Sequence, residues 1–243
     1  MLARMTAAMR QLPCFAILGA CGLLLAGCTP AFKSVPATPP AAVSADYPAD
    51  LQGAHLYRVA PEQSTLHILA YRGGTMANLG HNHVISSATL SGHIWIHDSS
   101  ARSGFSITLP VNDLIIDDPQ ARMAEGAEFV SVVSDAARAG THANLLKPEQ
   151  LDGEHYPVIR LRSLGITGTR TQPQVKVQIT IRNQARELMM PVQLSADGQS
   201  LRVTGQFQIR QTEFGITPYS VALGALQVQD ELTIKFALVA ISI

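Results

Sequence analysis

The sequence predicts an all-β domain, an antiparallel sandwich or barrel, on three observations. Apolar and polar residues alternate in many short segments after residue 54, which is typical of half-buried strands. Turn residues such as Gly73-Gly74 and Asp197-Gly198 separate these segments, and the second pair is a common hairpin turn. One interval alone, between residues 118 and 144, has a composition that favours helix.

The predicted strands follow one another at short intervals. They are centred on residues 66–71, 93–97, 105–111, 159–161, 175–181, 188–194, 201–209 and 232–238. In the third strand Phe105, Ile107 and Leu109 share one face, and Phe207 lies on the apolar face of a later strand. Because side chains of a half-buried strand alternate between core and solvent, these residues are expected to face the interior of the domain.

The helical interval predicts two short helices, at Pro119–Glu125 and Glu128–Arg138. Proline is favoured at the first position of a helix, and the interval is rich in Ala, Glu and Met. Asp117 and Asp118 are expected to cap the first helix and to interact with its positive end. A further short helical turn is predicted at Lys147–Leu151.

The N-terminus has the features of a bacterial lipoprotein leader. An apolar run at residues 12–26 is too short for a transmembrane helix and ends in Leu25-Ala26-Gly27-Cys28, which is similar to a lipobox. Cleavage before Cys28 and acylation of this residue are therefore expected, and two or more acyl chains give stable membrane attachment. The residue after Cys28 is Thr29, not Asp, which favours the periplasmic side of the outer membrane.

These features divide the chain into a leader at 1–27, a Pro- and Ala-rich tether at 28–53, and one domain at 54–243. The other two cysteines, Cys14 and Cys21, lie in the leader. The mature chain then has no disulfide, zinc–thiolate site or cysteine nucleophile. The formal net charge is zero and there is no basic run, which argues against a nucleic-acid partner.

The segment from Leu79 to Asp98 holds four of the eight histidines and the single tryptophan. His81 and His83 would share one face of an extended segment, about 7 Å apart. The segment shows no adjacent carboxylate or thiolate, whereas zinc prefers three or four protein ligands. The sequence therefore favours a loop or ligand head-group role for these two histidines, and no metal site is predicted. His93 and His97, about 13 Å apart on a strand, are too distant to share an ion.

Four short motifs resemble one family in their order and spacing. Leu151–Ser163 contains a Tyr-Pro pair and a strand that ends in serine, Tyr57–Ser64 reads as an opening strand and turn, Glu213–Ile216 contains Phe-Gly-Ile, and Val228–Leu232 begins a last strand. This arrangement resembles the YceI-like family of periplasmic polyisoprenoid-binding proteins, over residues 54–243. Two segments depart from the family pattern: Ala139–His142, where the family has charged residues, and Gly80-His81-Asn82-His83.

The resemblance implies a lipocalin-like, eight-stranded antiparallel barrel with an apolar tunnel that takes an isoprenoid chain. Barrels of this size enclose about one small ligand. The predicted function is a lipid-anchored periplasmic protein that binds or carries an isoprenoid lipid, such as a quinone or a polyprenyl phosphate. A homodimer is left open. The residues expected to contact the ligand are His81, His83, Trp95, Phe105, Ile107, Leu109 and Phe207.

Two other functions remain open. The protein could be a histidine-based metal or redox accessory protein for a membrane cytochrome, or a scaffold whose barrel is filled by its own side chains. A third donor clustered with His81 and His83 would favour the first, and a sealed interior would favour the second. No nucleophile elbow, phosphate loop or nucleotide motif is present, so neither an enzyme nor a cofactor is predicted.

Overall fold

The computed structural model describes residues 51–243, so the predicted leader, Cys28 and nearly all of the tether lie outside the described residues. The strands are β1 (His55–Val59), β2 (Thr65–Gly73), β3 (His83–Ser87), β4 (Ser91–Ile96), β5 (Gly104–Pro110), β6 (Leu114–Ile116), β7 (Val158–Gly168), β8 (Pro173–Ile181), β9 (Gln184–Ala196), β10 (Ser200–Arg210), β11 (Ser220–Val221) and β12 (Leu226–Ser242). Two α-helices, α1 (Pro119–Ala124) and α2 (Asp135–Leu145), separate β6 from β7.

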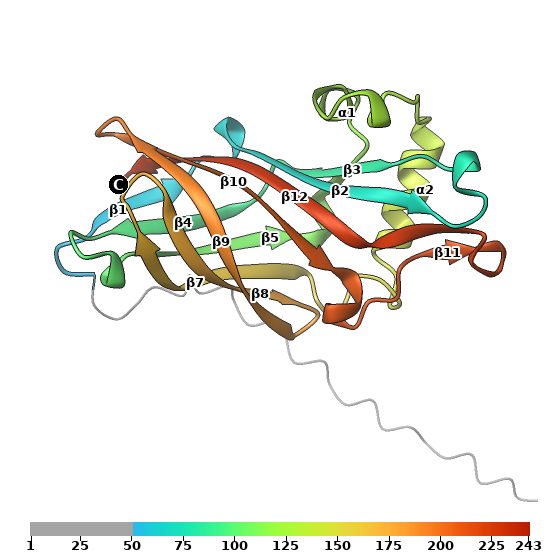
Figure 1. Cartoon of the computed structure of the whole chain (residues 1–243). Helices are drawn as coiled ribbons and strands as arrows, with labels where there is room; N and C mark the ends of the chain where they lie inside the picture. The colour runs from blue at the N-terminus through green and yellow to red at the C-terminus, as the bar shows by residue number, and fades with distance from the viewer. Residues whose placement is uncertain (1–50) are drawn as a thin grey trace, which may run out of the picture. The chain divides into compact units, whose positions relative to one another are not determined.

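The strands form a closed antiparallel barrel of eight strands, in the order β1-β4-β5-β7-β8-β9-β10-β12, with β12 pairing back to β1 (Figure 1). Three further strands, β2, β3 and β6, extend the sheet in line with β1, β4 and β5. β2 continues β1 along β12, β3 pairs with β2, and β6 pairs with β3. The predicted barrel is confirmed. Three pairs of strands lie in line with each other in its wall: β1 with β2, β4 with β3, and β5 with β6.

A proline and a serine account for the break between β1 and β2. Pro61 cannot donate to a ladder, so the chain leaves the sheet in a short 3-10 turn, Pro61–Gln63, between β1 and β2. The hydroxyl of Ser64 accepts from the Val239 backbone N–H at 3.0 Å and donates to the Ala60 carbonyl at 2.7 Å. The side chain thus replaces the missing backbone partner, and β12 remains hydrogen-bonded across the break.

The first predicted helix is confirmed as α1, but the second was placed too early. Residues 130–134 are not helical, and α2 begins only after Ser134, whose hydroxyl accepts from the Ala137 N–H. Lys147–Leu151 forms hydrogen-bonded turns and not the predicted helical turn. Within residues 51–243, neither helix has the length and apolar character needed to cross a membrane.

Two apolar clusters hold the domain together. The larger gathers residues from most strands of the barrel, among them Tyr57, Ile107 and Val177. The smaller consists of Leu69, Val84 and Phe129, with the Tyr71 ring 5.7 Å from that of Phe129. Phe129 lies in the turn after α1, so this second cluster packs the segment that follows α1 against β2 and β3.

Candidate functional site

The barrel encloses a cavity of about 750 Å³, within the range of small-molecule sites in proteins. Its wall is mostly apolar and is contributed by nearly every strand of the barrel. The apolar lining residues include Leu66, Ile94, Phe105, Ile107, Leu109, Leu161, Val175, Met190, Val192, Phe207, Phe236 and Leu238. The rings of Phe207 and Phe236 meet edge to face at 6.3 Å, so two neighbouring strands supply an aromatic section of the wall.

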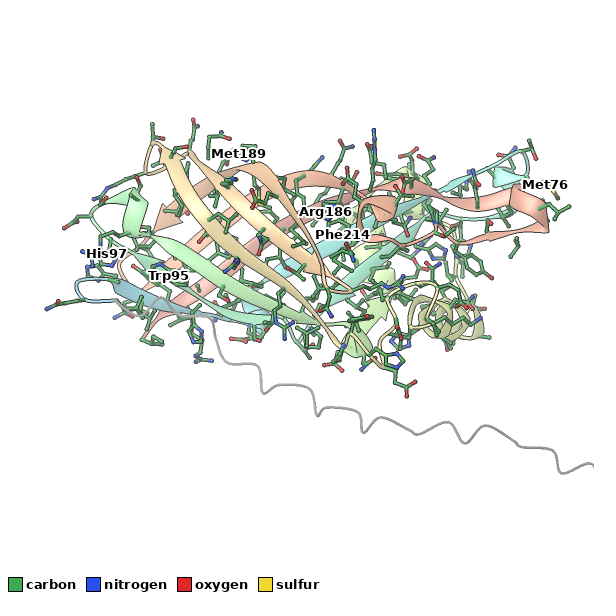
Figure 2. All side chains as sticks on the ribbon, turned by 90° about the horizontal axis from the view of Figure 1, so that it is seen from below. Met76, Trp95, His97, Arg186, Met189 and Phe214 are labelled. Carbon is green, nitrogen blue, oxygen red and sulfur yellow. The ribbon has the colours of Figure 1, made fainter. Side chains whose placement is uncertain are left out.

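The cavity reaches solvent at the barrel end that carries the C-terminus (Figure 1). There its lining passes from buried strand residues to exposed residues, among them Asp98 and Arg170 in two connections and Ser195 near the end of β9. His97 also lines the cavity at this end, where Figure 2 labels it. Its side chain is buried and its Nε2 atom has no hydrogen-bond partner. A polar donor or acceptor is therefore present beside the mouth of an apolar cavity.

The residues predicted to contact a ligand fall into two groups. Phe105, Ile107, Leu109 and Phe207 all line the cavity, as their alternation suggested. Trp95 is buried but does not line it, because Ile94 and Ile96 occupy the inner face of β4. Trp95 packs beside Gly104, where a Cβ atom would lie 2.7 Å from the indole ring.

His81 and His83 do not line the cavity either. His83 is the first residue of β3, and His81 lies two residues before it. β3 begins on the side of α1, away from the barrel end where Figure 2 labels His97 (Figure 1). The ring centroids of His81 and His83 are 4.5 Å apart. What they converge on is Asp117, which follows β6 in the chain.

The Asp117 carboxylate is completely buried and has several partners. Its Oδ2 atom is 2.7 Å from His83 Nδ1 and 3.9 Å from His81 Nε2. Its Oδ1 atom accepts from the Val84 backbone N–H at 2.9 Å and from the Arg122 guanidinium. The prediction that Asp117 caps the following helix was wrong. Asp118 alone caps α1, accepting from the backbone N–H groups of residues 120 and 121.

Arg122 connects this carboxylate to two other segments. It is buried on α1, and its Nη1 atom also donates to the Asn82 carbonyl at 2.6 Å. Its Nη2 atom donates to the carbonyl and hydroxyl of Ser131, at 3.1 and 2.9 Å. The Asn82 side chain in turn accepts from the Arg72 N–H and donates to the Glu128 carbonyl. The loop before β3 is therefore held by hydrogen bonds on both sides.

The electrostatics of the cluster follow from burial and from these contacts. Burial raises the pKa of Asp117, but the His83 and Val84 hydrogen bonds and Arg122 outweigh it and the pKa is lowered overall. The carboxylate is therefore ionised at neutral pH. Burial, followed by the charge of His83, lowers the pKa of His81, so its imidazole is neutral and can act as an acceptor.

A second buried carboxylate fixes the end of α1. The side chain of Glu125 is 6% exposed, and it contacts His67 Nδ1 on β2 at 2.6 Å and Lys235 Nζ on β12 at 2.7 Å. Burial raises the pKa of Glu125, but hydrogen bonds from Lys235 and His67 outweigh it and the pKa lies below its ordinary value. Together with Arg122, this contact holds α1 against the outside of the barrel.

Sequence reasoning missed His97, Asp117 and Arg122. His97 follows Trp95 by two residues, and strict alternation would place both on the outer face. However, β4 ends at Ile96, so the alternation no longer applies to His97. For Asp117 one signal was present: a helix needs one capping residue, and Asp117-Asp118 offers two. Arg122 carried no local signal, since its partners are 5, 9 and 40 residues away.

A closed eight-stranded barrel with an apolar cavity that reaches solvent at one end is a lipocalin-like ligand-binding architecture. Comparison with family models gives a more specific assignment. The YceI-like domain matches residues 57–240, and the chain belongs to this family. YceI-like proteins are periplasmic and share a polyisoprenoid-binding fold.

The solved structure of BcnA supports the fold. BcnA from Burkholderia cenocepacia is similar with a TM-score of 0.54 and 16% sequence identity, over 74% of this chain and 98% of BcnA. The YCEI protein from Campylobacter jejuni gives a TM-score of 0.45 and 10% identity, over 65% of this chain and 81% of that one. No curated protein sequence matches the chain significantly.

Proposed function

We propose that this protein binds an isoprenoid lipid, of the quinone or polyprenyl phosphate type, in the barrel cavity. The observation that carries the proposal is the cavity itself, because about 750 Å³ lies behind a continuous apolar wall. Burial of an isoprenoid tail there gains about 0.8 kcal/mol for each carbon group removed from water. A barrel that serves only as a scaffold would fill this volume with its own side chains.

The position of the polar groups supports an amphipathic ligand. His97 and Arg170 line the cavity only near its mouth, whereas the strand residues deeper in the wall are apolar. A lipid that enters tail first would place its polar head beside the His97 Nε2 atom, which has no partner within the protein. The role of binding protein, and not enzyme, fits a cavity whose wall is mostly apolar.

The test is the lipid content of the full-length protein purified from its own membranes. Native mass spectrometry should detect one prenyl lipid for each chain, and solvent extraction should release it. Delipidated protein should then take up either a quinone or a polyprenyl phosphate, and the two are offered separately to identify the head group. A protein that carries no prenyl lipid and takes up neither compound would refute the proposal.

We further propose that the protein is anchored to the outer membrane through Cys28, with residues 29–53 as a tether. The Leu-Ala-Gly-Cys sequence at the end of a short apolar leader supports this. Cys28→Ala is expected to abolish labelling by palmitate and to release the protein into the soluble periplasmic fraction. An unlabelled wild-type protein that is already soluble would contradict the anchor.

A further inference from the structure

Three side chains outside the cavity have the chemistry and spacing of a metal site. One ligand atom each from His81, His83 and Asp117 lies within 4.8 Å of the other two. In the part of the chain that the structure describes, no other group of His, Cys, Asp or Glu side chains meets this spacing. The carboxylate that the local sequence lacked is therefore supplied by a residue 34 positions away from His83.

Three neighbours of Asp117 make hydrogen bonds to its carboxylate, and a fourth, His81, does not. Oδ1 is used by the Val84 N–H and by Arg122, which together fix the carboxylate in place. Oδ2 is turned toward the two histidines, and only His83 makes a hydrogen bond to it. His81 Nε2 is buried, 3.9 Å from Oδ2, and has no hydrogen-bond partner. The network that holds the loop is complete without His81.

The distances are compatible with coordination after a small movement. Zinc lies about 2.1 Å from nitrogen and oxygen ligands, so ligand atoms around a tetrahedral ion are about 3.4 Å apart. The distances from Asp117 Oδ2, 2.7 Å to His83 and 3.9 Å to His81, lie on either side of this value. Rotation of the two rings by less than about 1 Å at the nitrogen atoms would bring both to coordination distance.

We propose that His81, His83 and Asp117 bind one divalent transition-metal ion. Two imidazoles and one carboxylate are ligands that suit Zn²⁺, Co²⁺ and Ni²⁺ better than Mg²⁺ or Ca²⁺, which prefer oxygen. Three protein ligands leave a coordination position open for water or a small ligand. The His81 side chain is 31% exposed, so an ion can reach the buried carboxylate from solvent.

Two contacts of Asp117, with His83 and with Arg122, affect how tightly the ion is bound. Ion binding replaces the hydrogen bond between His83 Nδ1 and Asp117, and the ring proton of a neutral His83 then lies on Nε2. Arg122 orients the carboxylate by donating to Asp117 Oδ1, but its positive charge also opposes the ion. A binding constant weaker than that of structural zinc sites, which have no adjacent cation, is therefore expected.

The experiment uses full-length protein stripped with a chelator and then titrated with Co²⁺. Bound Co²⁺ is followed by its visible d–d absorption, and Zn²⁺ should displace it at one ion per chain. His81→Ala should weaken Co²⁺ binding at least tenfold. This variant removes no hydrogen bond from the network, so its thermal unfolding without metal should match that of wild type.

His155→Ala is the matched control, since His155 pairs with Asp152 at 2.8 Å on an exposed turn. It should leave Co²⁺ binding unchanged. Asp117→Asn is unsuitable as the main test because it also weakens the buried contact to Arg122. Failure of wild type to bind one ion per chain, or equal affinity in wild type and His81→Ala, would overturn the proposal. Lipid binding in the cavity is independent of either result.

Discussion

A charge placed on the cavity wall separates lipid binding from folding. Ile107 on β5 lines the cavity and is 9% exposed, between Gly92 of β4 and Leu161 of β7. Ile107→Glu puts a carboxylate into this wall. Without lipid, water can enter through the mouth and hydrate the carboxylate. With lipid, the carboxylate would face an apolar chain and have no partner.

The magnitude follows from the balance of burial and desolvation. A five-carbon isoprene unit gains about 4 kcal/mol on burial, at about 0.8 kcal/mol for each carbon group. An unpaired buried carboxylate costs several kcal/mol, which offsets about one such unit. Since 1.4 kcal/mol is a tenfold change in affinity, Ile107→Glu should weaken lipid binding roughly 1,000-fold.

The assay is the amount of prenyl lipid extracted per mole of purified protein, together with circular dichroism and thermal unfolding. Ser106→Glu is the matched control, because Ser106 is on the outer face of the same strand and is paired with His93 and Arg162. It should retain lipid at the wild-type level. Equal lipid content in wild type and Ile107→Glu, or equal loss in both variants, would refute the assignment of the inner face.

Three further predictions concern the ion pairs and the cavity mouth. Arg122→Met leaves the buried Asp117 carboxylate uncompensated and should lower the free energy of unfolding by about 3–5 kcal/mol in urea denaturation. The control Arg138→Met breaks an exposed ion pair and should lower the free energy of unfolding by less than about 1 kcal/mol. Because the folded state lowers the pKa of Glu125, its contribution to stability is full above pH 4.5 and is lost as the pH falls below this value. Glu125→Gln should therefore be less stable than wild type at neutral pH and show a smaller loss on acidification, measured by urea denaturation between pH 7 and pH 3. His97→Leu should retain a prenyl hydrocarbon but weaken the binding of the same chain with a polar head at least fivefold, about 1 kcal/mol for one hydrogen bond, in a competition assay; equal effects on both lipids would exclude a head-group contact.

The strand pattern was predictable because the residues of a half-buried strand alternate between apolar, facing the core, and polar, facing solvent. On β5, Phe105, Ile107 and Leu109 all reach the cavity, as the period of two requires. Turn residues such as Asp197-Gly198 added the boundaries, and the β9–β10 hairpin forms there. The second helix was misplaced because its composition extends beyond it. The helix begins after Ser134, whose hydroxyl caps it, and not at Glu128.

The positions of the histidines could not be predicted from the alternation of residues along a strand. The sequence drew attention to the two histidines of the Gly-His-Asn-His segment, yet the distance of their side chains from the cavity depends on β3 and β4 lying in line along the barrel. Likewise, His97 enters the cavity because β4 ends one residue before it. Neither fact follows from local alternation, because both depend on how strands are aligned with strands that are distant in the chain.

The sequence by itself determined the antiparallel all-β pattern and the apolar face of its main strands, since both depend on residues that are close together in the chain. Only the tertiary structure decided that Asp117 meets His81 and His83, and that Arg122 balances its charge. These contacts join β3, β6 and α1, and the buried carboxylate is stable only because all of its partners arrive together. Long-range charge compensation of this kind leaves no periodic pattern in the sequence, so only the folded chain reveals it.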